Sequence, residues 1–196
     1  MRPVLVAAPL AIEQWLIRSG ARGAHVRKTG MGPEKALAAA ETLRGEPGAE
    51  LLVLGFCGGL DGVSRPGEVI VANEVLATGD EGHDPVRAVC ADPARLAELL
   101  SAAGLTVRRG PIVGVGKIAT GERREELLAA GALAVDMESA WLAAGAAGRP
   151  FDVVRVVLDS PSHELIRPQA LGGALTAARV LRRVAALALQ DRGTGG

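Results

Sequence analysis

The chain has 196 residues, of which 48% are hydrophobic and 22% are charged. A chain of this length and composition folds as one globular domain and buries a core without needing metals or disulfides. Its 22 basic and 22 acidic side chains give a formal net charge of +0, so no overall field favours nucleic acid or an anionic membrane surface as a partner. We therefore expect no nucleic-acid binding and no stable membrane association.

In the first half of the chain, short apolar runs typical of buried strands alternate with segments that carry helix start and stop signals. The expected elements are a strand at 3–8, a helix at 11–19, a strand at 24–28, a helix at 33–43, a strand at 51–60 and an extended segment at 68–77. The run at 51–60 is apolar throughout, which indicates burial on both faces. It ends in glycines that let the backbone lie against a ligand, so we predict a pocket at this turn, with an ordinary glycine bulge as the alternative.

A polar, glycine-bearing loop at 78–85 follows and is a candidate lid. The elements expected after it are a helix at 93–103, strands at 105–108 and 111–115, a helix at 122–130, a strand at 132–136, an alanine-rich helix ending near 148, a strand at 151–158 and a helix at 170–189. This alternation predicts a single-domain, three-layer α/β/α fold with a mixed, largely parallel central sheet. The domain should span residues 1–192, with a frayed tail at 193–196.

Cysteine use and hydropathy indicate the compartment. Cys57 and Cys90 are the two cysteines, too few for a disulfide framework and not spaced as metal ligands. The sequence shows neither a signal-peptide core nor an apolar run of membrane-spanning length. We therefore expect a cytoplasmic protein with reduced thiols and without a metal or another cofactor.

Four acidic residues stand at the edges of predicted strands or helices: Glu13, Asp136, Glu138 and Asp159. Asp159 follows the most apolar strand directly, where loss of hydration would favour the neutral form that a general acid needs. An Asx turn is the structural alternative for Asp159. Glu13 and Glu138 could instead serve only as partners of a helix dipole.

Two further patterns allow other chemistries. The sequence Gly-Val-Gly-Lys-Ile-Ala at 114–119 matches the loose dinucleotide pattern, so a nicotinamide-dependent oxidoreductase stays open beside ordinary turn chemistry. His83, flanked by Glu81 and Asp84, could ligate a metal. Without a second His or Cys at ligand spacing, a solvated loop residue is the simpler interpretation.

Four motifs, in their order and spacing, resemble the nucleoside phosphorylase/nucleosidase superfamily. They are Gly-Met-Gly at 30–32, Gly-Phe-Cys-Gly-Gly-Leu at 55–60 with Arg-Pro-Gly-Glu at 65–68, Val-Asp-Met-Glu-Ser-Ala at 135–140, and Arg-Val-Val-Leu-Asp at 155–159. The resemblance extends from Glu13 to Asp159. Within the superfamily the chain is most similar to the hopanoid-associated group, and 5′-methylthioadenosine/S-adenosylhomocysteine nucleosidases are better-known relatives.

This resemblance implies an enzyme, either an N-ribosyl hydrolase or a pentosyltransferase, that cleaves an N-ribosidic bond through an oxocarbenium-like transition state. Asp159 would protonate N7 of the base, and Glu13 would orient the attacking water. Glu138 would accept hydrogen bonds from the ribose hydroxyls, with Met137 packed on the sugar. The other substrate-binding residues that the resemblance implies are Phe56, Cys57, Gly58, Ile118, Ala119, Val135 and Asp136. The chain has no Tyr and so departs from the family, which often stacks an aromatic on the base.

Water is the expected nucleophile. Val53 and Phe56 stand where phosphate-using members of the superfamily carry Arg and Ser, and neither side chain can bind a phosphate dianion. Glu13 at the same end would repel phosphate. The backbone amides at 30–32 could still hold an anion, which leaves phosphorolysis as the alternative.

The expected substrate is an adenine nucleoside with a bulky apolar 5′ group. Adenosylhopane is favoured, and methylthioadenosine, adenosylhomocysteine and futalosine are the alternatives. A chain with 2% aromatic residues has little with which to hold a polar 5′ substituent, which supports this choice.

A nucleoside-binding sensor without turnover is the alternative to an enzyme. The resemblance also implies a homodimer, for which the alanine-rich segment 138–147 with Trp141 offers a close-packing face.

Overall fold

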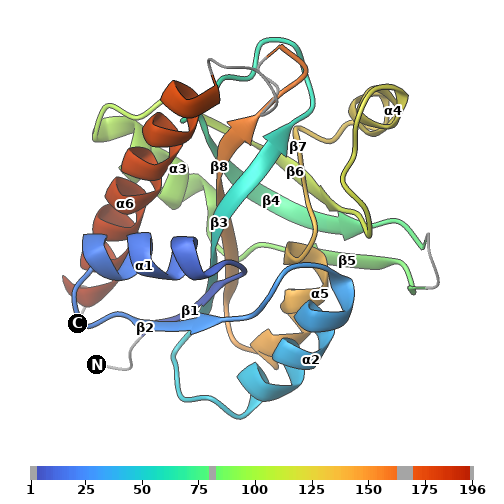
Figure 1. Ribbon diagram of the computed structural model, residues 1–196. Coiled ribbons are helices and arrows are strands. Elements are labelled where there is room, and N and C mark those ends of the chain that lie inside the picture. The colour runs from blue at the N-terminus through green and yellow to red at the C-terminus, as the bar shows by residue number, and fades with distance from the viewer. Residues whose placement is uncertain (1–3, 80–82, 163–169, 195–196) are drawn as a thin grey trace.

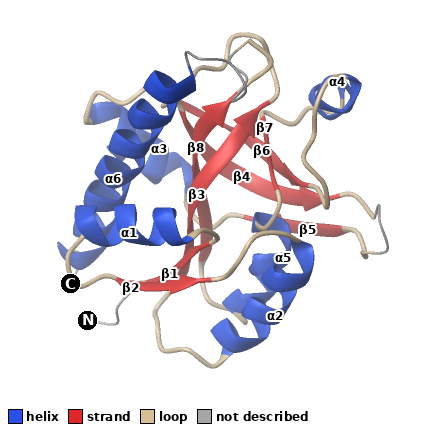
Figure 2. Ribbon diagram, viewed as in Figure 1, coloured by secondary structure: helices blue, strands red, loops and turns tan. Residues whose placement is uncertain are grey.

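The computed structural model describes residues 4–79, 83–162 and 170–194. Its centre is an eight-stranded mixed sheet with helices on both sides (Figures 1 and 2). The strands are β1 Leu5–Ala8, β2 His25–Lys28, β3 Leu51–Gly59, β4 Val69–Ala77, β5 Val86–Val89, β6 Val107–Gly114, β7 Ala134–Asp136 and β8 Phe151–Asp159. The helices are α1 Ala11–Gly20, α2 Pro33–Arg44, α3 Pro93–Ala102, α4 Glu122–Ala129, α5 Ser139–Leu142, the 3-10 helix η1 Ala143–Ala146, and α6 Ala170–Thr194. The predicted α/β single domain is confirmed.

Five of the strands, β3 among them, pair in a closed ring. The pairs β1–β2, β1–β3, β3–β8, β4–β6 and β6–β7 are parallel, and β3–β7, β4–β5 and β4–β8 are antiparallel. Because β8 pairs with both β3 and β4, the strands β3, β8, β4, β6 and β7 form a closed ring. The mixed, largely parallel sheet was predicted, whereas its closure was not.

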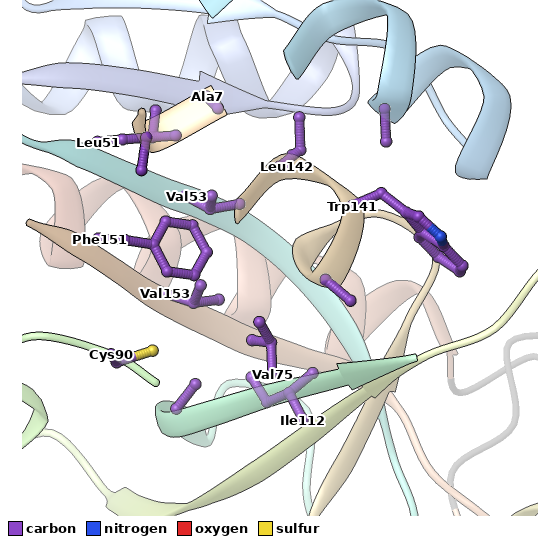
Figure 3. Packing of buried hydrophobic residues seen from close by; sticks show 14 of the residues in the cluster. Ala7, Leu51, Val53, Val75, Cys90, Ile112, Trp141, Leu142, Phe151 and Val153 are labelled. Carbon is purple, nitrogen blue, oxygen red and sulfur yellow. The ribbon is translucent and has the colours of Figure 1, made fainter. Parts of the chain in front are cut away.

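Burial on both faces explains the unbroken apolar sequence of β3. Leu51 and Val53 belong to a core cluster covered by α2, α5 and η1, part of which is drawn in Figure 3. Leu52 and Leu54, which point the other way, belong to a cluster covered by α1, α3 and α6. Successive side chains of a strand alternate between faces, so only a strand with helices on both sides is apolar throughout.

Some predicted elements differ in extent. The short strand β5 was not predicted. It has only four residues, and its alternating burial is that of an edge strand. The two strands expected around Gly110 are one strand, β6. The helix expected to end near 148 is divided into α5 and η1, and α6 extends to Thr194, into the segment predicted as a frayed tail.

Trp141 is a core residue. Its side chain lies in the cluster with Phe151 and Ile112 (Figure 3) and is 3% exposed. The prediction that segment 138–147 presents Trp141 on a dimer face is therefore wrong, because all four residues of α5 are buried within the chain. Among the described helices, none combines the length and the apolar character needed to span a bilayer.

Candidate active site

The carboxyl-terminal ends of β3, β7 and β8 and the first turn of α1 surround a cavity of about 190 Å³. Charged side chains in its wall are Glu13, Arg124, Asp136, Glu138 and Asp159. The rest of the wall comes from Pro9, Leu10, Met31, Phe56, Cys57, Gly58, Val115, Ile118, Ala119, Val135, Met137 and Leu158. Every residue predicted as catalytic or substrate-binding is thus in one cavity. The role of each remains a prediction.

Glu13 lies at the start of α1 and is 1% exposed. One carboxylate oxygen accepts a hydrogen bond from the Leu10 N–H at 2.6 Å, and the other accepts one from the Phe56 N–H at 2.6 Å. Glu13 therefore contacts the start of α1 and also lines the cavity. Burial raises the pKa of Glu13, although nearby Arg155 acts in the opposite direction.

Gly55 makes room for this arrangement. A Cβ at Gly55 would lie 2.5 Å from both Glu13 Oε1 and Arg155 Nη1, closer than side-chain atoms approach in folded proteins. The glycine lets two charged side chains from different elements meet over the bare backbone of β3. We infer that any larger residue at 55 would displace Glu13 from the cavity.

Arg155, on β8, is the cation beneath the cavity and is completely buried. Its Nη2 lies 2.7 Å from Asp136 Oδ2, 3.5 Å from Glu138 Oε2 and 2.9 Å from Ser139 Oγ. Burial alone would lower the pKa of Arg155, but the facing carboxylates outweigh it and the pKa is raised. Arg155 therefore holds its positive charge, which is what allows these acids to be buried together.

Asp136 orients the segment that carries Glu138. Its Oδ1 accepts hydrogen bonds from the N–H groups of Glu138 and Ser139, each at 3.2 Å, and its Oδ2 accepts one from the Ser139 hydroxyl. Asp136 is 5% exposed, with its acceptors directed at protein groups. The geometry therefore favours a supporting role for Asp136 over direct substrate contact.

Glu138 is held between an amide and a cation. Its Oε1 accepts a hydrogen bond from the Gly32 N–H at 3.1 Å, and its Oε2 faces Arg155. Burial raises the pKa of Glu138 to about 7, with Arg155 opposing the shift. The Gly-Met-Gly turn thus fixes a carboxylate that lies 106 residues further along the chain.

Asp159 does not stand in apolar surroundings, as the sequence suggested. Its Oδ2 lies 2.6 Å from Arg124 Nη2, and its side chain is half-buried. The prediction of a carboxyl group isolated by desolvation is wrong, because α4 brings a guanidinium to the end of β8. The pattern of α4 gave no sign of this, since Glu-Arg-Arg-Glu-Glu is typical of a solvated helix face.

Val53 and Phe56 are the two residues that stand where phosphate-using members of the superfamily carry phosphate ligands. Phe56 lines the cavity, but Val53 is completely buried in the core and does not.

Cys57 lines the cavity as a free thiol, and burial raises its pKa far above the usual range, so it is no nucleophile near neutral pH. Ile118, 73% exposed, and Met31, 51% exposed, form an apolar rim.

The alternative chemistries find little support. Gly114 ends β6, and the next helix begins only at Glu122, whereas a dinucleotide fingerprint opens a helix directly. His83 packs edge-on against Trp141 at 5.6 Å between ring centroids, and no cluster of potential metal ligands occurs in 4–79, 83–162 or 170–194. The candidate lid at 78–85 includes residues 80–82, which lie outside the described residues.

The fold and the cavity define an α/β protein with acid–base groups gathered at the ends of its strands. More particularly, the chain belongs to the phosphorylase superfamily, because the sequence model of that family matches residues 12–186. The predicted superfamily is thereby confirmed, as is the expectation that the protein is an enzyme. A comparison with curated proteins found no significant match.

Solved structures of nucleosidases share the fold. A 5′-methylthioadenosine/S-adenosylhomocysteine nucleosidase from Campylobacter jejuni superposes with a TM-score of 0.78 at 13% identity, covering 98% of this chain and 100% of that one. A mutant of the Helicobacter pylori enzyme with 5′-methylthioadenosine in its active site gives 0.77 at 15% identity, covering 97% of each chain. Futalosine hydrolase of Helicobacter pylori gives 0.74 at 17% identity, covering 97% and 96%. At these identities the similarity shows a common fold.

Proposed function

We propose that the protein is a purine nucleosidase that hydrolyses the N-glycosidic bond of a 5′-substituted adenosine. The observation that carries this proposal is that Glu13, Glu138 and Asp159 line the same cavity. Cleaving such a bond requires an acid for the leaving base, a carboxylate for the ribose and a base for water. The names of the structural neighbours, methylthioadenosine/adenosylhomocysteine nucleosidases and futalosine hydrolase, agree with this class.

Each carboxylate has a place in the proposed reaction. Glu138 accepts hydrogen bonds from the ribose hydroxyls and orients the sugar. Asp159 donates a proton to N7, and the bond between C1′ and N9 breaks with its electron pair passing to the base. The water oxygen bonds to C1′, and Glu13 receives the proton that the water loses. The raised pKa of Glu13 suits this last step, because it makes the carboxylate a stronger base.

Hydrolysis rather than phosphorolysis is the first prediction. Base release from an adenine nucleoside should proceed at the same rate with and without inorganic phosphate, because Glu13 lines the cavity and would repel an anion there. Product analysis should find free ribose or its 5′-substituted form. Strict dependence on phosphate, with a ribose 1-phosphate as product, would contradict the proposal and establish a nucleoside phosphorylase.

The second prediction concerns the 5′ substituent. The apolar rim of Met31 and Ile118 supports a bulky apolar group, and each buried methylene contributes about 0.8 kcal/mol. We propose adenosylhopane as the substrate. Adenine release from a panel of 5′-substituted adenosines should show the highest kcat/KM for the lipid-tailed nucleoside. A clear preference for methylthioadenosine, adenosylhomocysteine or futalosine would replace this substrate while keeping the nucleosidase class.

A homodimer in the cytoplasm is the third prediction. Because α5 is buried, we assign the interface to exposed apolar side chains on other helices, such as Ile12, 52% exposed, and Trp15, 63% exposed, on one face of α1. Ile12 and Trp15 are three residues apart and so lie side by side on the helix, and a contiguous exposed apolar patch is what an interaction surface requires. Sedimentation at micromolar concentration should give twice the 20.0 kDa monomer mass. A monomeric species there would reject the dimer.

A further inference from the structure

Arg124 is a charged residue of the cavity wall to which no step of the proposed reaction assigns a role. It belongs to α4, whose sequence is typical of a solvated helix, yet Arg124 is 6% exposed. A buried guanidinium needs several partners, because each unsatisfied N–H group would lose its hydration without compensation. Three partners are present, and they connect different parts of the site.

The guanidinium is anchored by two backbone carbonyls. Arg124 Nε donates to the Ala119 carbonyl at 2.8 Å, and Nη1 donates to the Gly59 carbonyl at 3.1 Å. These bonds attach the group to the end of β3 and to the segment predicted to hold the base. The third partner, Asp159 Oδ2 at 2.6 Å from Nη2, is therefore held by a cation that is itself fixed at two other points.

Gly58 leaves room for the ion pair between Arg124 and Asp159. A Cβ at Gly58 would lie 3.2 Å from Arg124 Nη2 and 3.2 Å from Asp159 Oδ1. The ion pair thus packs directly on the backbone of β3, where a side chain would crowd it. Because Arg124 occupies Oδ2, the orientation of Oδ1 is fixed relative to Gly58 and the cavity.

We propose that Arg124 is a positioning residue for Asp159, an inference that rests on the proposed function. Arg124 holds Oδ2 so that Oδ1 faces N7 of the bound purine. When the purine binds, Asp159 takes one proton from solvent and passes it to N7. Arg124 then stabilises the carboxylate that the transfer restores. The hydrogen bond from Arg124 to the Ala119 carbonyl fixes the position of Asp159 relative to the segment that would bind the purine.

The experiment compares Arg124→Gln and Arg124→Lys with Arg123→Gln, whose side chain is 40% exposed and pairs with Glu126. Because a small misplacement of a catalytic group costs about 100-fold in rate, R124Q should lower kcat by about 100-fold with little change in KM. R124K should give an intermediate kcat, since it keeps the charge but loses the fixed geometry. R123Q should match the wild type.

Two readouts separate this role from a merely structural one. The alkaline limb of the profile of kcat/KM against pH should move to higher pH in R124Q, because the charged acid has lost its partner. Calorimetry of adenine binding in two buffers of different ionisation enthalpy should show proton uptake by the wild type and less uptake by R124Q. A fall in kcat without either change would overturn the proposal, as would unchanged kcat.

The outcomes also distinguish this inference from the proposed function. No base release by the wild type from any nucleoside of the panel would reject the function, while the adenine-binding measurement would still test Arg124. Normal wild-type turnover with an unaltered R124Q would reject the role of Arg124 alone. Absence of adenine binding to the wild type would overturn both.

Discussion

Asp159→Asn should lower kcat for base release by about 10² to 10⁴-fold, the usual contribution of a general acid. Asparagine has nearly the same shape, but its amide is not an acid and cannot transfer a proton to N7. Nucleoside affinity should change little, because Glu138 and the apolar wall remain. Steady-state kinetics and calorimetry with the nucleoside measure the two effects separately.

A matched control is Asp84→Asn, since Asp84 is exposed and does not line the cavity. Its kcat should equal that of the wild type. Equal turnover by D159N and the wild type would reject the acid role of Asp159. Loss of both turnover and nucleoside binding would show that Asp159 is needed for affinity, and would contradict a role confined to acid catalysis.

Arg155→Met should destabilise the fold by about 3 to 5 kcal/mol, because it leaves buried carboxylates without their cation. Asp136 and Glu138 would then face each other with the positive charge removed. Urea denaturation followed by circular dichroism measures the free energy of unfolding. Arg87→Met is the control, since Arg87 is 71% exposed in its ion pair with Glu74, and it should change stability by about 0.5 kcal/mol or less.

The deficit of R155M should also depend on pH in a defined direction. Glu138 already has a folded-state pKa of about 7, above its ordinary value of 4.5. A raised carboxyl pKa contributes stability that is present below the unfolded-state pKa and is lost as pH rises through the folded-state value. Removal of Arg155 raises that value further, so the deficit should be nearly constant below about pH 6 and grow as the pH rises through about 7. A deficit that shrinks over this range would contradict the role assigned to Arg155.

Continuous apolar character was the pattern most informative about the fold. It identified β3 as a strand covered on both faces and β8 as a strand, and the glycines after Leu54 correctly indicated a cavity. Closure of the sheet could not be predicted, because every buried strand has a similar composition. Nothing in Phe151–Asp159 says that it pairs with β3 on one side and β4 on the other.

The site was predictable where sequence position determines chemistry and not where distant segments meet. Glu13, Glu138 and Asp159 were found because each follows or begins a regular element. Arg124 was missed because its contact with Asp159 spans |i−j|=35 and its helix looks solvated. Arg155 did leave a signal, since a lone arginine in an apolar strand is rarely buried without an acid to face it.

The closed ring of strands has a consequence for how the protein is made. During synthesis, β3 and β4 emerge early, but the strand that joins them, β8, is completed only at Asp159. Until then the β3 and β4 edges that will receive β8 have no partner, and neither Arg155 nor Asp159 exists in the nascent chain. Such long-range pairing is slow and exposes strand edges to aggregation. Ribosome-bound chains that stop before residue 151 should therefore depend on chaperones.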